Sequence, residues 1–124
     1  RVIRDFYSDW QQYEGESTAL PQAGMVVLNE FARNYPGTVS EFQRTYAGAL
    51  EWTVANPAEA APLVEASASI PAQVFVQSME RTRLHFVPGS EARADVDVYL
   101  SRLLDFSPEM VGGKLPDEKF YLSN

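Results

Sequence analysis

Residues 38–53, TVSEFQRTYAGALEWT, carry the pattern that decides the fold class. Thr38 can accept hydrogen bonds from the free amides at the start of a helix, and Glu41 three residues later can reach back to it. Uncharged side chains then recur at steps of three and four residues: Val39, Phe42, Tyr46, Ala49, Leu50 and Thr53. The pattern predicts a helix of about four turns whose stripe forms the main face of the core.

Further helices are predicted downstream of this stretch. Asn56 and Pro57 have the residue types of an N-cap and a first helical position, although Pro62 interrupts the pattern that follows. Another helix is expected with Pro71 in its first turn, and Ser90 is a candidate cap for a longer one. The longer helix would place Val96, Tyr99, Leu100 and Leu103 on one stripe. Ser107 and Pro108 begin one more turn.

The N-terminal part has a different pattern, which indicates strands. Val2 and Ile3 form a short apolar opening, and a polar stretch closed by Pro21 and Gly24 follows, so residues 1–24 are predicted as a strand end and a loop. Residues 25–28 (MVVL) suit a strand that is buried on both faces. Asn29 is expected to cap a short helix after it.

The order of elements therefore predicts an α/β fold. One or two short strands precede about four to five helices, which fits the helical flank of an α/β domain. A small helical bundle with one hairpin is the alternative.

Composition limits the classes of partner and site. The 124 residues suit one domain, and a formal charge of -7 disfavours nucleic acids and anionic membrane surfaces. No apolar run reaches the roughly 20 residues needed to span a bilayer, so direct membrane insertion is not expected. The absence of cysteine excludes disulfides, thiolate zinc sites and cysteine nucleophiles.

Sequence motifs of catalysis are also missing. His85 is the single histidine, so it has no imidazole partner for a metal site, and no Gly-x-Ser-x-Gly motif is present. Gly112, Gly113 and Lys114 lack the spacing of a phosphate-binding loop and suit a hinge. We therefore predict a protein that is not an enzyme and needs no cofactor, although spatial pairs of carboxylates are invisible in sequence.

Three residues are candidates for ligand binding. Asp5 follows the predicted first strand, and open α/β sheets present ligand-binding groups past their strand ends. The competing interpretation is an aspartate that forms a local turn. Trp10 could line a cleft or fill an interface, and Asn29 directly follows the second predicted strand.

Several stretches resemble one family of transport proteins. They are residues 25–31 (MVVLNEF), 34–36 (NYP), 39–42 (VSEF), 49–52 (ALEW), 55–60 (ANPAEA), 115–117 (LPD) and 120–121 (FY). In this order they resemble the C-terminal segment of nitrate/sulfonate/taurine-type solute-binding proteins of ABC transporters. The resemblance covers roughly residues 1 to 122.

The resemblance implies a type II periplasmic-binding-protein fold with two α/β lobes that close over a small molecule. Residues 1–24 would be a strand end and loop of the second lobe, and residues 25–124 the crossing strand and the C-terminal helices that return to the first lobe. In taurine-type members a strand ends in an aspartate that receives the ligand's amine, which Asp5 matches. Phe6 and the longer loop from Trp10 to Pro21 depart from the family pattern.

The function implied by this resemblance is the capture of a small organic or oxyanionic solute, such as a sulfonate, nitrate, taurine or a thiamin precursor, for delivery to an ABC permease. The location would be periplasmic or lipid-anchored. Apolar surface left by truncation would favour a homodimer. A free-standing helical interaction module is the alternative function, and the single histidine argues against a thiamin-pyrimidine enzyme of the same bilobal type.

Overall fold

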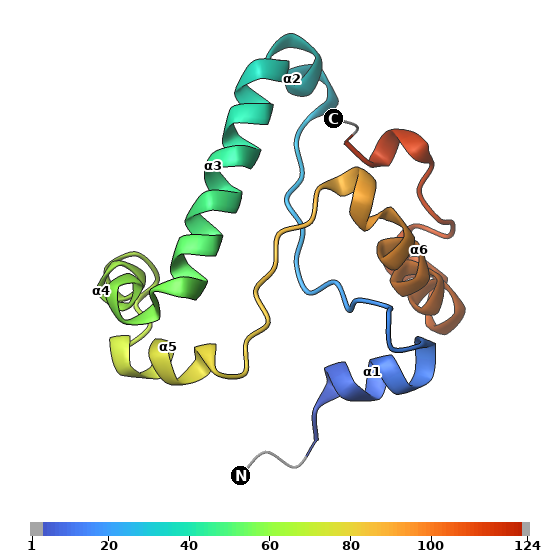
Figure 1. Cartoon of the computed structure of the whole chain (residues 1–124). Helices are drawn as coiled ribbons and strands as arrows, with labels where there is room; N and C mark the ends of the chain where they lie inside the picture. The colour runs from blue at the N-terminus through green and yellow to red at the C-terminus, as the bar shows by residue number, and fades with distance from the viewer. Residues whose placement is uncertain (1–3, 123–124) are drawn as a thin grey trace. The chain divides into compact units, whose positions relative to one another are not determined.

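The computed structural model describes residues 4–122, and helices account for all of their regular structure (Figure 1). They form two compact units: residues 4–27 with 88–122, here called the terminal unit, and residues 28–87, the middle unit. The helices are α1 (Phe6–Glu14), α2 (Asn29–Asn34), α3 (Pro36–Ala55), α4 (Pro57–Ala68), α5 (Ala72–Met79) and α6 (Gly89–Phe106), with two 3-10 helices, η1 (Pro108–Val111) and η2 (Glu118–Phe120).

The predicted α/β fold is wrong for the described residues, since residues 4–122 contain no strand. Residues 25–28 are extended, but they pair with no other segment in this range, and a strand needs a neighbour to satisfy its amides and carbonyls. Val26 is 90% exposed and Leu28 is 80% exposed, so this run is not the doubly buried strand that its valines suggested. Val2 and Ile3 lie outside the described residues.

Helix α1 occupies the region predicted as a strand end and a loop. Asp5 begins it, because its carboxylate accepts hydrogen bonds from the backbone amides of Tyr7 and Ser8. Aromatic side chains at positions 6, 7, 10 and 13 then follow helical spacing. Gly15, at a φ of 110°, ends the helix.

Helix α3 confirms the helix predicted from residues 38–53, with two differences. It begins at Pro36, and Glu41 forms an ion pair with Arg44 at 2.6 Å in place of a capping box. The predicted core face is also wrong, because Phe42 is 56% exposed and Tyr46 is 40% exposed. Val39 and Leu50, from the same stripe, are half-buried.

Helices α4 and α5 form the best-packed part of the middle unit. Ala60 and Ala61 on α4 are the two residues classed as buried among those described, and their small side chains allow close helix packing. Pro62 lies inside α4 without ending it, and Ser69 closes the helix in a left-handed conformation. Asn56 precedes α4 as predicted, but its side chain donates to the Trp52 carbonyl at the end of α3, at 2.9 Å.

In the terminal unit, side chains of α1 and the loop that follows it contact α6. The Trp10 and Tyr99 ring centroids are 5.9 Å apart, and the Ala19 amide donates to the Asp95 carboxylate at 3.2 Å. Helix α6 begins at Gly89, next to the predicted cap Ser90. Its predicted apolar stripe is half-buried throughout: Val96, Tyr99, Leu100 and Leu103.

Candidate functional site

Asp5 is used by its own helix. Its carboxylate accepts from the Tyr7 amide at 3.0 Å, the Ser8 amide at 3.4 Å and the Ser8 hydroxyl at 3.2 Å. These bonds agree with the local-turn interpretation of this residue. Ligand binding by Asp5 stays a prediction, and its carboxylate would have to serve a ligand in addition to the α1 cap.

Trp10 and Asn29 lie in different units. The Trp10 indole is half-buried and donates from Nε1 to the Ala19 carbonyl at 3.1 Å, and its ring contacts Tyr99. These contacts suit a side chain that joins α1 to the rest of the terminal unit. Asn29 is the first residue of α2 in the middle unit, where it is exposed. The structure thus places two of the three candidates at or on α1.

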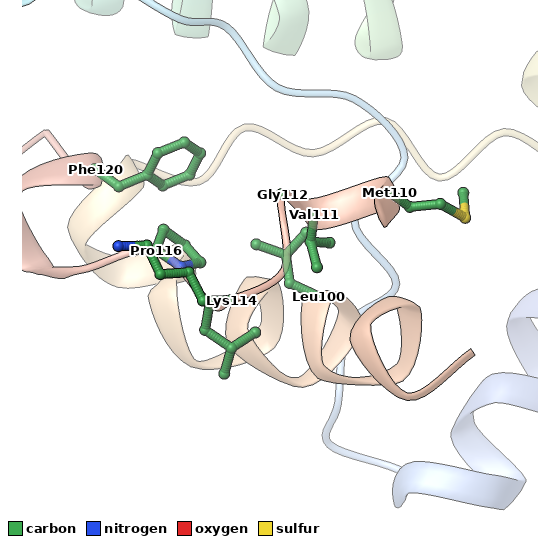
Figure 2. A pocket seen from close by; sticks show the side chains of 8 residues that line it. Leu100, Met110, Val111, Gly112, Lys114, Pro116 and Phe120 are labelled. Atoms are coloured by element: carbon green, nitrogen blue, oxygen red, sulfur yellow. The ribbon is translucent and has the colours of Figure 1, made fainter. Parts of the chain in front are cut away.

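A pocket of about 350 Å³ lies between α6 and the C-terminal segment of the terminal unit. Figure 2 shows the segment that follows Gly112 running beside α6, with the side chains that line the pocket drawn as sticks. Those side chains are mainly apolar, with one cation; the lining residues are Leu100, Met110, Val111, Gly112, Lys114, Leu115, Pro116 and Phe120.

Two glycines form the turn beside this pocket, and the first of them, Gly112, lines it. Gly112 has a φ of 69° and Gly113 a φ of 82°, conformations that residues with a Cβ rarely adopt. The Gly112 amide donates to the Glu109 carbonyl at 3.3 Å, and the Gly113 amide to the Pro108 carbonyl at 2.7 Å. Because both amides are used, this turn is not a phosphate cradle, in agreement with the missing sequence motif.

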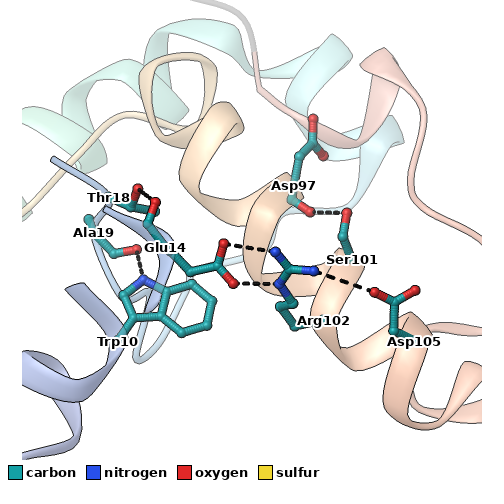
Figure 3. Close-up of polar contacts among 8 residues, drawn as sticks. All are labelled: Trp10, Glu14, Thr18, Ala19, Asp97, Ser101, Arg102 and Asp105. Atoms are coloured by element: carbon teal, nitrogen blue, oxygen red, sulfur yellow. Dashed lines mark hydrogen bonds and ion pairs between the residues drawn. The ribbon is translucent and has the colours of Figure 1, made fainter. Parts of the chain in front are cut away.

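Sequence reasoning missed an ion pair that joins α1 to α6 (Figure 3). Glu14 on α1 accepts two hydrogen bonds from the Arg102 guanidinium on α6; one joins Oε2 to Nη2 at 3.0 Å, and the other joins Oε1 to Nε. The Glu14 side chain is only 8% exposed, whereas that of Arg102 is 47% exposed. Asp105 and the Tyr13 ring also lie near the guanidinium, at 3.6 Å and 5.5 Å.

This geometry shifts the pKa of both partners. The hydrogen bonds from Arg102 lower the pKa of Glu14, against a smaller opposing effect of burial. The same bonds raise the pKa of Arg102 above its already high ordinary value. The pair keeps both charges in place and serves as a link between helices, because neither group is poised to exchange a proton near neutral pH.

A second polar cluster holds the C-terminal segment on α6. The Tyr121 hydroxyl donates to the Asp97 carboxylate at 2.5 Å, and Arg93 lies 3.5 Å from both Asp97 and Glu118. The Arg93 guanidinium also stands 5.5 Å from the centre of the Tyr121 ring. Burial, followed by the hydrogen bond and the negative charge of Asp97, raises the pKa of Tyr121 to about 12.

The middle unit exposes a group of aromatic side chains on α2 and α3. We call Phe31, Tyr35, Phe42 and Tyr46 the α2–α3 aromatic set; all four are exposed. The ring centroids of Phe31 and Tyr35 are 5.0 Å apart, and those of Phe42 and Tyr46 are 6.2 Å apart. Tyr46 also contacts Phe86. Such neighbouring exposed aromatics are typical of a surface that another molecule or domain covers.

The described part of the chain offers no metal site. Within residues 4–122, no three His, Cys, Asp or Glu side chains are grouped closely enough to hold a metal ion. His85 is exposed and lies in the extended segment between α5 and α6. None of the helices in this range is both long and apolar enough to cross a membrane.

Comparisons with known proteins give no family for this chain. No family model matches it, and neither does any curated protein or solved structure.

Proposed function

We propose that this chain is a helical part of the extracytoplasmic solute-binding component of an ABC importer. Such a protein captures a small organic or oxyanionic solute by lobe closure and delivers it to a membrane permease. The observation that carries the proposal is the large surface that the helices leave exposed, which includes many large apolar side chains, together with the order of the family-like segments.

The exposed surface is larger than two separately folded units need. The chain exposes 9781 Å², whereas two units of about 7 kDa each would together expose about 8,000 Å² by the scaling of surface area with mass. Among the described residues only Ala60 and Ala61 are buried. The excess of about 1,800 Å² is the area of a large interface, and the lobes of a solute-binding protein would supply the missing cover.

Two of the family-like segments, residues 25–28 and 55–60, lie where the chain passes from one element or unit to the next. Residues 25–28 run through the point where the chain leaves the terminal unit for the middle unit, and the chain returns between Val87 and Pro88. Asn56 and Pro57 join α3 to α4. In the family that the sequence resembles, the corresponding segment crosses between two lobes. Residues 25–28 likewise connect two units, so this connectivity supports the proposal.

A ligand screen on the intact product of the encoding gene tests the proposal. Thermal unfolding would be followed with nitrate, taurine, an alkanesulfonate and a thiamin-precursor pyrimidine, each at several concentrations. One of them should raise the midpoint, because a ligand at 100 times its Kd stabilises the folded state by about 2.7 kcal/mol. Cell fractionation should recover the protein outside the cytoplasm. No stabilisation by any of these ligands, with the protein in the cytosolic fraction, would contradict the proposal.

The α2–α3 aromatic set favours a second candidate, a free-standing helical interaction module. Phe42 and Tyr46 stand side by side on one face of α3, where a protein partner could bury both. This candidate predicts a stable partner of defined stoichiometry that is lost in Phe42→Ser and in Tyr46→Ser. Phe106→Ser is the matched control, since Phe106 is 85% exposed but lies on α6. If a solute stabilises the protein and no such protein partner is found, the importer component is favoured over the interaction module.

A further inference from the structure

The pocket beside α6 is an open depression with the volume of a small-molecule site. Its volume of about 350 Å³ lies at the lower end of the range for ligand pockets, about 300 to 1,000 Å³. Leu100, Val111 and Leu115 contribute aliphatic walls, while Met110 and Phe120 line the pocket and remain 61% and 58% exposed. A hydrocarbon group in the pocket would remove this surface from water.

Lys114 is the one charged residue that lines the pocket. Its ammonium group forms no ion pair within residues 4–122. The acids that follow it in sequence are already engaged: Asp117 accepts from the Lys119 amide at 2.9 Å, and Glu118 lies 3.5 Å from Arg93. An unpaired cation beside apolar walls is complementary to a molecule with one negative charge and a hydrocarbon tail.

The backbone amides near Lys114 favour a carboxylate over a phosphate as the anion that binds there. Because the Gly112 and Gly113 amides donate to Glu109 and Pro108 carbonyls, they are not free to surround a phosphate. A phosphate would therefore meet a single ammonium group and otherwise apolar walls, which cannot replace its hydration. A carboxylate needs fewer hydrogen-bond donors than a phosphate. A hydrocarbon tail attached to it would be stabilised by contact with the apolar side chains of the pocket.

We propose that this pocket is a binding site for an amphipathic carboxylate, with the carboxylate at Lys114 and the hydrocarbon tail against Leu100, Val111 and Leu115. The site is built from residues of the terminal unit alone. The proposal goes beyond the transport function. The two are tested independently, because this test uses neither the importer ligands nor the intact gene product.

The test is a titration of the methyl-labelled chain with octanoate, followed by NMR. Saturable shifts are expected for the methyl groups of Leu100, Val111 and Leu115, and much smaller ones for Leu63, which is exposed on α4. Lys114→Gln should weaken octanoate about three- to fivefold, the effect expected of one solvent-accessible ion pair. Lys119→Gln, which removes a lysine that does not line the pocket, should leave the affinity unchanged.

Neutral and inorganic probes complete the test. Octan-1-ol should bind more weakly than octanoate to the wild-type chain and equally to wild type and Lys114→Gln, while inorganic phosphate should produce no saturable methyl shift. Leu115→Ser, a change in the exposed rim that spares the helices, should weaken octanoate and octan-1-ol alike. The proposal is overturned if octanoate does not saturate, or if Lys114→Gln binds it as tightly as the wild type does.

Discussion

At the scale of single residues, Ser69 is the one described residue other than glycine with a positive φ, at 56°. It ends α4, where the left-handed conformation costs a residue with a Cβ about 1–2 kcal/mol. Ser69→Gly should therefore raise the free energy of unfolding by about 0.5–1 kcal/mol, since part of the relief is offset by the greater entropy of glycine in the unfolded chain. Urea unfolding would measure the change, and Ser69→Ala should show no gain. Equal effects of the two variants would contradict this explanation.

The raised pKa of Tyr121 predicts that the folded chain loses stability at alkaline pH. Burial and the bond to Asp97 raise its pKa from 10.0 to about 12, so the folded chain holds this proton where the unfolded chain has released it. The stability that the raised pKa of Tyr121 adds to the folded chain is fully present below about pH 10 and is lost as the pH rises toward about 12. Phenolate absorbance should show one late ionisation that disappears in Tyr121→Phe but persists in Tyr35→Phe. Ionisation of Tyr121 near pH 10 would show that its hydroxyl is neither buried nor bonded to Asp97 in solution.

At the scale of elements, local signals predicted the helices that begin with a cap or a proline. Pro57, Pro71 and Ser90 lie within two residues of the starts of α4, α5 and α6. Helix α1 was missed, although Asp5 as its cap and the helical spacing of its aromatic residues were readable signals. Residues 25–28 have the composition of a strand, but composition does not reveal whether a pairing partner exists.

The link between α1 and α6 could not be predicted, because Glu14 and Arg102 are 88 positions apart in sequence. This ion pair can be tested by measuring stability at acid pH. Since hydrogen bonds from Arg102 lower the pKa of Glu14, the pair contributes stability above the ordinary glutamate value of 4.5 and loses it as the pH falls through the lower folded value. Glu14→Gln should reduce stability at pH 6, and its unfolding free energy should fall less between pH 6 and pH 3.

The matched control for this pair is Glu16→Gln, an exposed glutamate in the loop after α1. It should keep the acid dependence of the wild-type chain in the same urea titrations. High salt should weaken the wild type more than Glu14→Gln, because the Arg102 side chain is partly accessible to ions. Identical pH profiles for the wild type and Glu14→Gln would show that the ion pair does not form in solution.

At the scale of the whole molecule, the apolar pattern predicted helices better than it predicted burial. The stripe on α3 has the period of a core face, yet Phe42 and Tyr46 stay exposed. Period alone shows that one side of a helix is apolar, and it does not identify the surface that covers that side. The pocket near Lys114 was equally unpredictable, because it depends on how residues 110–120 fold back on α6.

This uncovered surface predicts how the chain behaves alone in solution. A net charge of -7 keeps copies apart at low ionic strength, where the screening length is about 30 Å at 0.01 M salt and only about 3 Å at 1 M. Sedimentation velocity should therefore show self-association that grows with salt. Phe42→Ser and Tyr46→Ser should reduce it, and Phe106→Ser should not, because association would bury the α2–α3 aromatic set. Association that weakens with salt would point instead to charge pairing, and equal effects of the three substitutions to nonspecific contact.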